Sequence, residues 1–310
     1  MKLSKPQFWN NKYSLISILL LPISLIIILL IFLKKKLSYE KKHKISVICV
    51  GNLYLGGTGK TPLSIYIAKI VKKLGKRTAI VKKFYENQYD ELNLIKSNNI
   101  DLFTDKNRNS AILKAEKNNH NVVILDDGFQ DMSFQKDLSI ICFNEKQLIG
   151  NGRTIPSGPL RETMQSLKKA KIIMINGKRN IKFEKKILDI SNSLNIYYSN
   201  YKPTNIKEFK NHSLIAFAGI GNPNNFFDLL RKNKLKVKKT ISYPDHYEFS
   251  KNELLEIISE AKKKHLKIIT TEKDYYRLKH FNLNDIKCLK VKLEIKNKNK
   301  FIKNIIKYIK

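Results

Sequence analysis

A glycine-rich segment contains the residue types best suited to binding phosphate groups. The sequence Gly51-Asn-Leu-Tyr-Leu-Gly-Gly-Thr-Gly-Lys-Thr-Pro62 follows an apolar run and precedes a helix-like segment. Its glycines allow backbone conformations in which several N–H groups converge on phosphate oxygens. Lys60 would reach the β- and γ-phosphates of a nucleotide, and the hydroxyl group of Thr61 would bind Mg²⁺. The spacing therefore predicts a P-loop whose nucleotide-binding residues are Gly56, Gly57, Thr58, Gly59, Lys60 and Thr61.

One position departs from the strict P-loop pattern. That pattern has a glycine five residues before Gly59, where this chain has Tyr54. The alternative for the segment is a glycine-rich hairpin or a simple turn. A P-loop is favoured because a Gly-Lys-Thr triplet rarely follows a buried strand by accident.

Two adjacent acids are the candidate metal ligands. Asp126 and Asp127 directly follow the apolar run Val122-Val-Ile-Leu, which is typical of a buried strand. Ligands of α/β folds bind at the carboxyl ends of the strands, and a P-loop needs a carboxylate there to hold Mg²⁺. Asp127 is the favoured metal residue, with Asp126 as its neighbour and Thr61 as the third ligand. The alternative is an acidic turn that caps an ordinary strand.

Strand-like and helix-like segments alternate from residue 45 onward, which is typical of an α/β fold with a mainly parallel sheet. Strands are predicted at 45–51, 78–82, 122–126, 138–143, 171–176, 214–218, 237–242, 267–271 and 289–295. Helices are predicted at 60–74, 90–98, 107–118, 223–233, 251–264 and 298–308. The fold class is therefore a P-loop NTPase-like sheet with a second, smaller α/β unit that begins near residue 212.

The amino-terminal region is apolar and is followed by many lysines. Residues 13–33 form 21 positions without a charge, and as one helix they would span about 31 Å, close to the thickness of a bilayer core. Six lysines follow between residues 34 and 44, whereas Lys2, Lys5 and Lys12 precede the run, which favours a cytoplasmic carboxyl-terminal side. A membrane helix is expected, with a kinked or partly inserted monotopic helix as the alternative.

These features predict four consecutive parts of the chain. The membrane anchor and its basic flank occupy 1–44, and the P-loop core occupies 45–176. A linker with one strand follows over 177–211, and a smaller α/β domain occupies 212–310. The body of the chain is expected at the inner, cytoplasmic face of a membrane.

The composition excludes some classes of protein and leaves others open. The chain has 60 Lys and Arg against 26 Asp and Glu, a net charge of +34. Nucleic-acid binding, a membrane surface and a general compositional bias each account for such a charge. Lysines are spread everywhere without a concentrated arginine patch. The apolar anchor and the absence of an evident aromatic-basic stacking motif argue against a nucleic-acid partner, so none is expected. Three isolated cysteines without a C-x-x-C pair exclude a zinc or disulfide framework.

Several motifs that occur in a fixed order give a more specific indication. They are Gly51-Asn-Leu, Gly56-Gly-Thr-Gly-Lys-Thr-Pro62, Asp126-Asp-Gly-Phe-Gln130, Gly150-Asn-Gly-Arg153, Pro156-Ser-Gly-Pro-Leu-Arg-Glu162, Gly219-Ile-Gly-Asn-Pro223, Asp245-His246 and Thr270-Thr-Glu-Lys-Asp274. In this combination the chain resembles the tetraacyldisaccharide 4'-kinases, the lipid A 4'-kinases of Gram-negative bacteria. That family also lacks the first glycine of the P-loop pattern. The resemblance implies transfer of phosphate from ATP, with Mg²⁺, to the 4'-hydroxyl of a tetraacylated glucosamine disaccharide 1-phosphate at the inner membrane.

The resemblance also implies roles for individual residues. Lys60 and Thr61 match the phosphate and Mg²⁺ positions of the family, and Asp127 matches its acidic pair. The segment that carries the family's proposed base is Tyr89-Asp90-Glu91 here, so Asp90 is the candidate base and His246 its partner. A carboxylate suits this role because phosphoryl transfer needs alignment and late proton removal.

Two arginines are candidate substrate contacts. Arg153 and Arg161 carry guanidinium groups, which fit phosphate in a two-pronged manner, so they are predicted to contact phosphates of ATP or of the lipid. The alternative for each is an ion pair with Glu162 or a helix cap.

One region departs from the family pattern. The family's Ser-Arg-Gly-Tyr after the second strand is Lys82-Lys83-Phe84-Tyr85 here, and Asp131 replaces a histidine after Gln130. The oligomeric state is not predictable. Alternatives to a lipid kinase are a membrane-tethered P-loop ATPase that acts as a switch or assembly factor, a nucleic-acid-binding ATPase, and a homologue that binds nucleotide without transferring phosphate.

Overall fold

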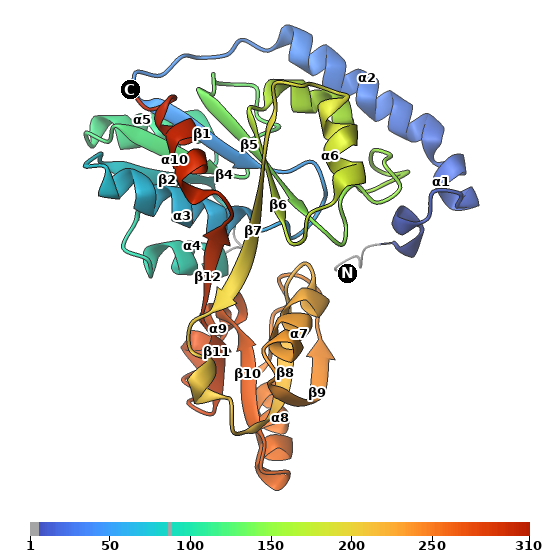
Figure 1. Ribbon diagram of the computed structural model, residues 1–310, viewed down its shortest axis with the longest axis vertical. Helices are drawn as coiled ribbons and strands as arrows, with labels where there is room; N and C mark the ends of the chain where they lie inside the picture. The colour runs from blue at the N-terminus through green and yellow to red at the C-terminus, as the bar shows by residue number, and fades with distance from the viewer. Residues whose placement is uncertain (1–5, 86–88) are drawn as a thin grey trace. The chain divides into compact units, whose positions relative to one another are not determined.

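A computed structural model describes residues 6–85 and 89–310 of the chain. Predictions that concern Lys2, Lys5 and residues 86–88 of the divergent region lie outside the described residues. Strands and helices alternate along most of the described chain (Figure 1). Short 3₁₀ helices occur at Gln7–Asn10, Met164–Lys169, Ile206–Glu208 and Lys279–Phe281.

The larger sheet has eight strands in the order β12-β7-β6-β5-β1-β4-β2-β3 among the described residues. Every pair from β3 to β7 in that order is parallel. The strands are β1 (Ser46–Gly51), β2 (Thr78–Lys83), β3 (Asp101–Asp105), β4 (Val122–Asp126), β5 (Leu138–Asn144), β6 (Ile172–Asn176), β7 (Asn195–Pro203) and β12 (Val291–Ile295). The central strands β1, β4 and β5 are buried along their whole length, which matches their continuous runs of β-branched and apolar residues.

Helices cover both faces of this sheet. They are α3 (Lys60–Lys73), α5 (Arg108–Lys117), α6 (Ile181–Leu188) and α10 (Lys298–Ile306). Buried side chains of α5 and α6 join one hydrophobic core with alternate residues of the central strands. On α10, Phe301 lies edge-on to Tyr197 of β7 and tilted against Tyr66 of α3, so α3 and α10 share the other face. Helix α3 begins directly after the turn that follows β1.

The smaller sheet is also parallel. Its strands run in the order β11-β10-β8-β9. The strands are β8 (Ser213–Ala218), β9 (Lys236–Ser242), β10 (Lys267–Thr271) and β11 (Ile286–Leu289), and the helices of this unit are α4 (Tyr89–Lys96), α7 (Pro223–Lys232), α8 (Lys251–Lys263) and α9 (Glu272–Leu278). A capping box at Ser250 and Glu253 starts α8, and the Thr271 side chain caps α9. Two apolar clusters line the two sides of this sheet.

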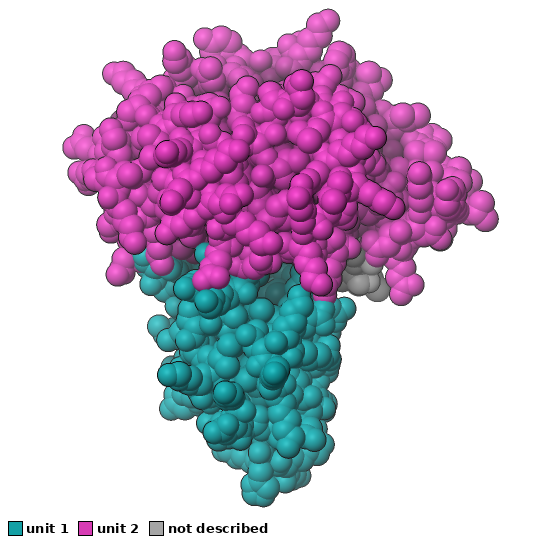
Figure 2. Space-filling view, viewed as in Figure 1, with its two compact units in different colours: residues 1–2, 85–98, 201–293 teal, residues 3–84, 99–200, 294–310 magenta. Residues whose placement is uncertain are grey.

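The chain divides into two compact units that are not consecutive in sequence (Figure 2). The larger unit holds the described residues of Leu3–Phe84, with Asn99–Asn200 and Glu294–Lys310. The smaller unit holds those of Tyr85–Asn98, with Tyr201–Leu293.

This division differs from the four consecutive parts expected from the sequence. Helix α4 belongs to the smaller unit because its buried face and Asp90 pack against α9. Helix α10 belongs to the larger unit because Phe301 packs between Tyr66 and Tyr197. Both are long-range contacts, which a local sequence pattern does not indicate.

The apolar amino-terminal region forms two helices instead of one. Helix α1 covers Leu15–Leu19 and α2 covers Leu21–Leu37, with the break at Leu20. Pro22 lies in the first turn of α2, where its missing N–H group costs no helical hydrogen bond. Among residues 6–85 and 89–310, no helix has the length and apolar character needed to cross a bilayer. The expected membrane-spanning helix is therefore not confirmed.

The predicted strands and helices outside this region are confirmed at nearly the expected positions. Among the helices and strands of the described residues, β3, α6, α9 and β11 were not predicted. Strand β3 has no fully buried residue, so it lacks the apolar run that identifies a strand. The predicted strand at 289–295 corresponds to β12, which joins the larger sheet instead of the smaller one.

We expect the Phe301→Ala substitution to destabilise the larger unit. The Phe301 side chain is fully buried, so its removal leaves a cavity that costs about 3–5 kcal/mol. Urea unfolding followed by circular dichroism measures the change. Ile306→Ala, on the same helix but 42% exposed, serves as the control and should change stability by less than about 1 kcal/mol. Equal effects of the two substitutions would contradict the packing of α10.

Candidate active site

The predicted P-loop lies in the turn between β1 and α3 of the larger unit. Gly59 is the N-cap of α3 with a φ of 88°, and Gly56 has a φ of 136°. Both values lie in the region that favours glycine. The side-chain amide of Asn52 donates to the carbonyl oxygens of Tyr54 (2.6 Å) and Gly56 (3.1 Å), and so braces the turn.

The amino terminus of α3 is suited to bind an anion. Its first turn contains no acidic side chain, so the unpaired N–H groups there keep their positive partial charge. The Oγ1 atom of Thr58 is buried and has no hydrogen-bond partner among the described residues. A buried hydroxyl group without a partner is costly, and a phosphate oxygen is a suitable acceptor for it. The residues present therefore fit a nucleotide phosphate.

Asp126 is fully buried at the carboxyl end of β4 and is held by three donors. Thr61 Oγ1 donates to its carboxylate at 2.8 Å, and Ser64 Oγ does so at 3.3 Å. Lys82 of β2 places its ammonium group 2.9 Å from the same carboxylate. This lysine is one of the departures from the family pattern, and no local pattern indicates its contact with the acidic pair.

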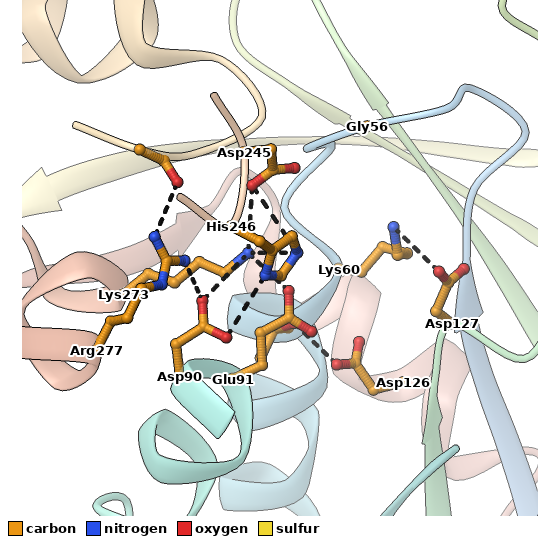
Figure 3. A network of polar contacts seen from close by, with 12 residues as sticks. Gly56, Lys60, Asp90, Glu91, Asp126, Asp127, Asp245, His246, Lys273 and Arg277 are labelled. Carbon is orange, nitrogen blue, oxygen red and sulfur yellow. Dashed lines mark hydrogen bonds and ion pairs between the residues drawn. The ribbon is translucent and has the colours of Figure 1, made fainter. Parts of the chain in front are cut away.

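Asp127 has different partners, which are the two cations Lys60 and Arg161 (Figure 3 for Lys60). Lys60 Nζ lies 3.6 Å from Asp127 Oδ2, and Arg161 Nη1 donates to the two carboxylate oxygens at 2.9 and 3.1 Å. Burial would raise the pKa of Asp127, but the charges of Lys60 and Arg161 outweigh it and lower the pKa. The φ of Asp127 is 63°, a left-handed conformation that is uncommon outside glycine and is found at functional sites.

The structure separates the two arginines proposed as substrate contacts. Arg161 lies at the acidic pair, as described above. Arg153 Nη1 instead donates to Ser17 Oγ of α1 at 2.8 Å, so this guanidinium holds the amino-terminal helices.

In the smaller unit, the candidate base Asp90 and His246 come together (Figure 3). His246 Nδ1 lies 3.6 Å from Asp90 Oδ1, longer than a hydrogen bond but within the range of an ion pair. Two cations that the sequence analysis missed also face Asp90. Arg277 Nη2 donates to Asp90 Oδ2 at 2.5 Å, and Lys273 Nζ lies 3.7 Å from the same oxygen.

These neighbours set the charge of Asp90. Burial alone would raise the pKa of its carboxyl group, but the contact with His246 and the charges of Lys273 and Arg277 lower the pKa to about 2. Lys273 also pairs with Glu91 at 2.8 Å. Burial would lower the pKa of Lys273, yet the carboxylates of Glu91, Asp245 and Asp90 raise it. Asp90 is therefore an anion at neutral pH, in contact with the cations Lys273 and Arg277.

A fully buried aspartate orients the arginine of this network. Asp274 accepts from the backbone N–H of Gly219 at 3.0 Å and from Thr271 Oγ1 at 2.7 Å, and it also pairs with Arg277 Nη1 at 3.0 Å. Burial raises the pKa of Asp274. The Thr270-Thr-Glu-Lys-Asp274 motif thus supplies an N-cap, the Lys273 charge and a support for Arg277. Its occurrence in the sequence was the signal for this network, although no role could be assigned to it there.

Known proteins resemble this chain over nearly its whole length. The model of the tetraacyldisaccharide-1-P 4'-kinase family matches residues 16–310. A tetraacyldisaccharide 4'-kinase of Pelagibacter ubique (strain HTCC1062) is 44% identical over 311 residues, which cover 99% of this chain and 98% of the relative. One of Rickettsia canadensis (strain McKiel) is 34% identical over 323 residues, with 99% and 98% covered.

A solved structure shares the fold. It is an "apo" form LpxK of Aquifex aeolicus in complex with ATP, with a TM-score of 0.74 and 24% identity, and the likeness covers 96% of this chain and 100% of that chain. The resemblance inferred from the motifs is confirmed, whereas the roles of individual residues stay predictions. On the family match and the two full-length relatives, this chain belongs to the tetraacyldisaccharide 4'-kinase family.

Proposed function

We propose that the chain transfers the γ-phosphate of ATP to the 4'-hydroxyl group of a tetraacylated glucosamine disaccharide 1-phosphate, a step of lipid A biosynthesis. Membership of the kinase family supports this activity. The single observation that carries it is the cation pair on Asp127, formed by Lys60 at the start of α3 and by Arg161. Such a pair, next to a helix amino terminus, provides the positive charge that a triphosphate needs.

The larger unit binds the nucleotide in this proposal. Backbone N–H groups of the turn and of the first turn of α3 hold the phosphates, and Thr58 donates its unpartnered hydroxyl group. Lys60 and Arg161 exchange Asp127 for phosphate oxygens, which carry more negative charge than one carboxylate. Both cations then stabilise the charge that spreads over the transferred phosphoryl group.

The hydroxyl group of Thr61 and the carboxylate of Asp127 would hold Mg²⁺, with the buried carboxylate of Asp126 next to Thr61. When bound, Mg²⁺ would neutralise charge on the β- and γ-phosphates. The described residues contain no group of three or more His, Cys, Asp and Glu side chains able to form a closed metal site, and Mg²⁺ bound with a nucleotide needs only one or two carboxylates. Asp126 is engaged by Thr61, Ser64 and Lys82, so Asp127 is the favoured direct ligand.

Asp90 is the proposed acceptor of the proton. The sugar hydroxyl donates a hydrogen bond to its carboxylate, the new O–P bond forms, and the bond between the γ-phosphorus and the bridging oxygen of ADP breaks. The proton moves to Asp90 late in this process, when the attacking oxygen has become acidic. His246 orients the carboxylate. A carboxylate with a low pKa is a weak base but stays ionised, which suits a role based on alignment.

We further propose that α1 and α2 attach the body to the inner face of a membrane. Large apolar side chains on these helices are exposed, including Leu15, Leu19, Leu25, Ile26, Leu29, Leu30 and Phe32. Lys34, Lys35 and Lys36 follow in the last turn of α2. An apolar face next to lysines is typical of a helix that lies in the interface of an anionic membrane. The acyl chains of the lipid substrate are held in the same interface.

The kinase activity is tested with γ-labelled ATP and the acylated disaccharide in detergent micelles. The wild-type chain is expected to produce labelled lipid. Lys60→Ala and Asp90→Ala should each lower kcat by at least about a hundredfold, because each removes a group that acts in the transition state. Lys73→Ala, an exposed lysine at the other end of α3, should keep the wild-type rate. Absence of labelled lipid from folded wild-type protein would refute the proposal, and ATP hydrolysis indifferent to the lipid would favour the ATPase alternative.

The pH dependence tests the charge network around Asp90. Arg277→Gln removes a cation that lowers the pKa of Asp90, so this pKa should rise by roughly one to three units. The catalytic form is the anion, and activity is lost as the pH falls through the pKa. The acid limb of kcat/KM, below pH 4 for the wild type, should therefore move to higher pH. Arg231→Gln, at an exposed ion pair with Asp228, is the control. An unchanged acid limb in Arg277→Gln would contradict the role of Asp90.

Vesicle sedimentation tests the proposed attachment. The full chain should co-sediment with vesicles that contain anionic lipid more strongly than with neutral vesicles, by about 1 kcal/mol for each lysine near the surface. Replacing Leu29 and Phe32 together by Glu should release the protein, because both side chains are more than half exposed on α2. Leu188→Glu, an exposed position on α6, is the matched control. Release by Leu188→Glu to the same extent would argue against α2 as the contact.

A further inference from the structure

The segment 151–162 is hydrogen-bonded to the chain just before the P-loop. The backbone N–H of Leu55 donates to the carbonyl oxygen of Pro159 at 2.9 Å, and the N–H of Arg161 donates to that of Leu53 at 2.7 Å. Both bonds lie within a few residues of Gly56, where the phosphate turn begins. A shift of the backbone at 159–161 therefore reaches the P-loop directly.

The same segment holds the amino-terminal helices through two buried serines. Ser17 Oγ accepts from Asn151 Nδ2 at 3.0 Å and from Arg153 Nη1 at 2.8 Å. Ser24 Oγ donates to the carbonyl oxygen of Thr154 and accepts from the N–H of Ser157, both at 3.0 Å. Before the lysines at the end of α2, these serines are the polar side chains of the two helices, so they fix which face of α1 and α2 meets the body.

An ion pair at the end of α2 completes this connection. Lys35 Nζ lies 2.6 Å from Glu162 Oε2, and the Glu162 side chain is only 4% exposed. A buried carboxylate without a cation is strongly unfavourable, so the ammonium group keeps Glu162 in place. Glu162 is the residue next to Arg161, whose guanidinium holds both oxygens of Asp127 and also donates to Gln130 Oε1 at 3.3 Å.

We infer that Lys35 is a positioning residue for the nucleotide site. By fixing Glu162 it fixes the backbone at Arg161, and thereby places the guanidinium at Asp127 and at the triphosphate. The seating of α1 and α2 on the body then sets the affinity for a nucleoside triphosphate with its Mg²⁺ ion. The inference deepens the proposed function, because it rests on the role that this function assigns to Arg161 and Asp127.

This role differs from the general electrostatic role of the basic flank. Lys36 is the next residue of α2 and carries the same charge, but it is exposed. Lys36 therefore adds positive charge that is attracted to an anionic membrane surface, without the contact to Glu162 that Lys35 makes. A comparison of substitutions at the two lysines therefore distinguishes attraction to a membrane from positioning of Arg161.

The test compares Lys35→Gln with Lys36→Gln in the full chain in neutral detergent micelles. Two quantities are measured, the KM for ATP in the kinase assay and the Kd of a fluorescent ATP analogue with Mg²⁺ in the absence of lipid substrate. Lys35→Gln should raise both by about tenfold, within the range typical of coupling between distinct sites. Lys36→Gln should leave both unchanged. Lys35→Arg keeps the cation and should restore the nucleotide affinity.

A second variant guards against misfolding of Lys35→Gln. Glu162→Gln removes the buried charge while keeping the shape, so no carboxylate is left unpaired. It should weaken nucleotide binding as Lys35→Gln does, and the double variant should be no weaker than either, which shows that the two residues act as one unit. Nucleotide affinities of Lys35→Gln and Glu162→Gln equal to those of Lys36→Gln and the wild type would overturn the inference.

The outcomes also separate the inference from the proposed function. If the wild type transfers no phosphate to the lipid while Lys35→Gln still weakens binding of the ATP analogue, the proposed substrate is wrong and the positioning role stands. If the wild type is an active kinase and Lys35→Gln binds the analogue normally, the activity stands and the positioning role is wrong.

Discussion

The larger unit depends on how two neighbouring carboxylates at the end of β4 are neutralised. Asp126 is sealed from solvent and held by a hydroxyl group of α3 and the ammonium group of Lys82. Asp127 turns into a left-handed conformation and faces Lys60 and Arg161 instead. Asp126 thus links β4 to α3 and β2. Asp127 pairs with two cations that a more negative ligand can bind in its place. The two carboxylates thus have separate cationic partners.

In the smaller unit, the buried carboxylate of Asp90 is stabilised by a network of charged side chains. Asp90, Glu91 and Asp245 lie within ion-pair distance of Lys273, and Asp90 also contacts Arg277 and the ring of His246. Asp274 accepts a hydrogen bond from Arg277 and another from the backbone N–H of Gly219, and so fixes the position of Arg277. Such a network keeps Asp90 ionised and oriented, at the cost of making it a weak base. That compromise is acceptable for phosphoryl transfer, where charge stabilisation and alignment contribute more than basicity.

The sequence predicts those parts of the fold and site that depend on local patterns. The P-loop follows from glycines, Lys60 and Thr61 within a few positions, and the acidic pair follows from its place after a buried strand. Lys82 and Arg277 act through contacts between distant segments, which no local pattern indicates. Lys273 lies in a motif that marked the segment, but the motif did not reveal its partners. Arg153 illustrates the same limit, because its guanidinium type suggested phosphate while its actual partner is Ser17. The apolar run over 13–33 indicated a membrane, but nothing in it indicated that Ser17 and Ser24 hold the run to the body. Only the order of several motifs made the family recognisable.

The most direct test of the site is a crystal structure of the full chain with a non-hydrolysable ATP analogue and Mg²⁺. We expect the triphosphate at the N–H groups of residues 56–61, with Lys60 and Arg161 moved from Asp127 onto phosphate oxygens. Mg²⁺ should lie between Thr61 and the carboxylate of Asp127. A triphosphate bound elsewhere, or a Lys60–Asp127 contact that persists beside a bound nucleotide, would contradict the assignment of the larger unit as the phosphate-binding half of a kinase.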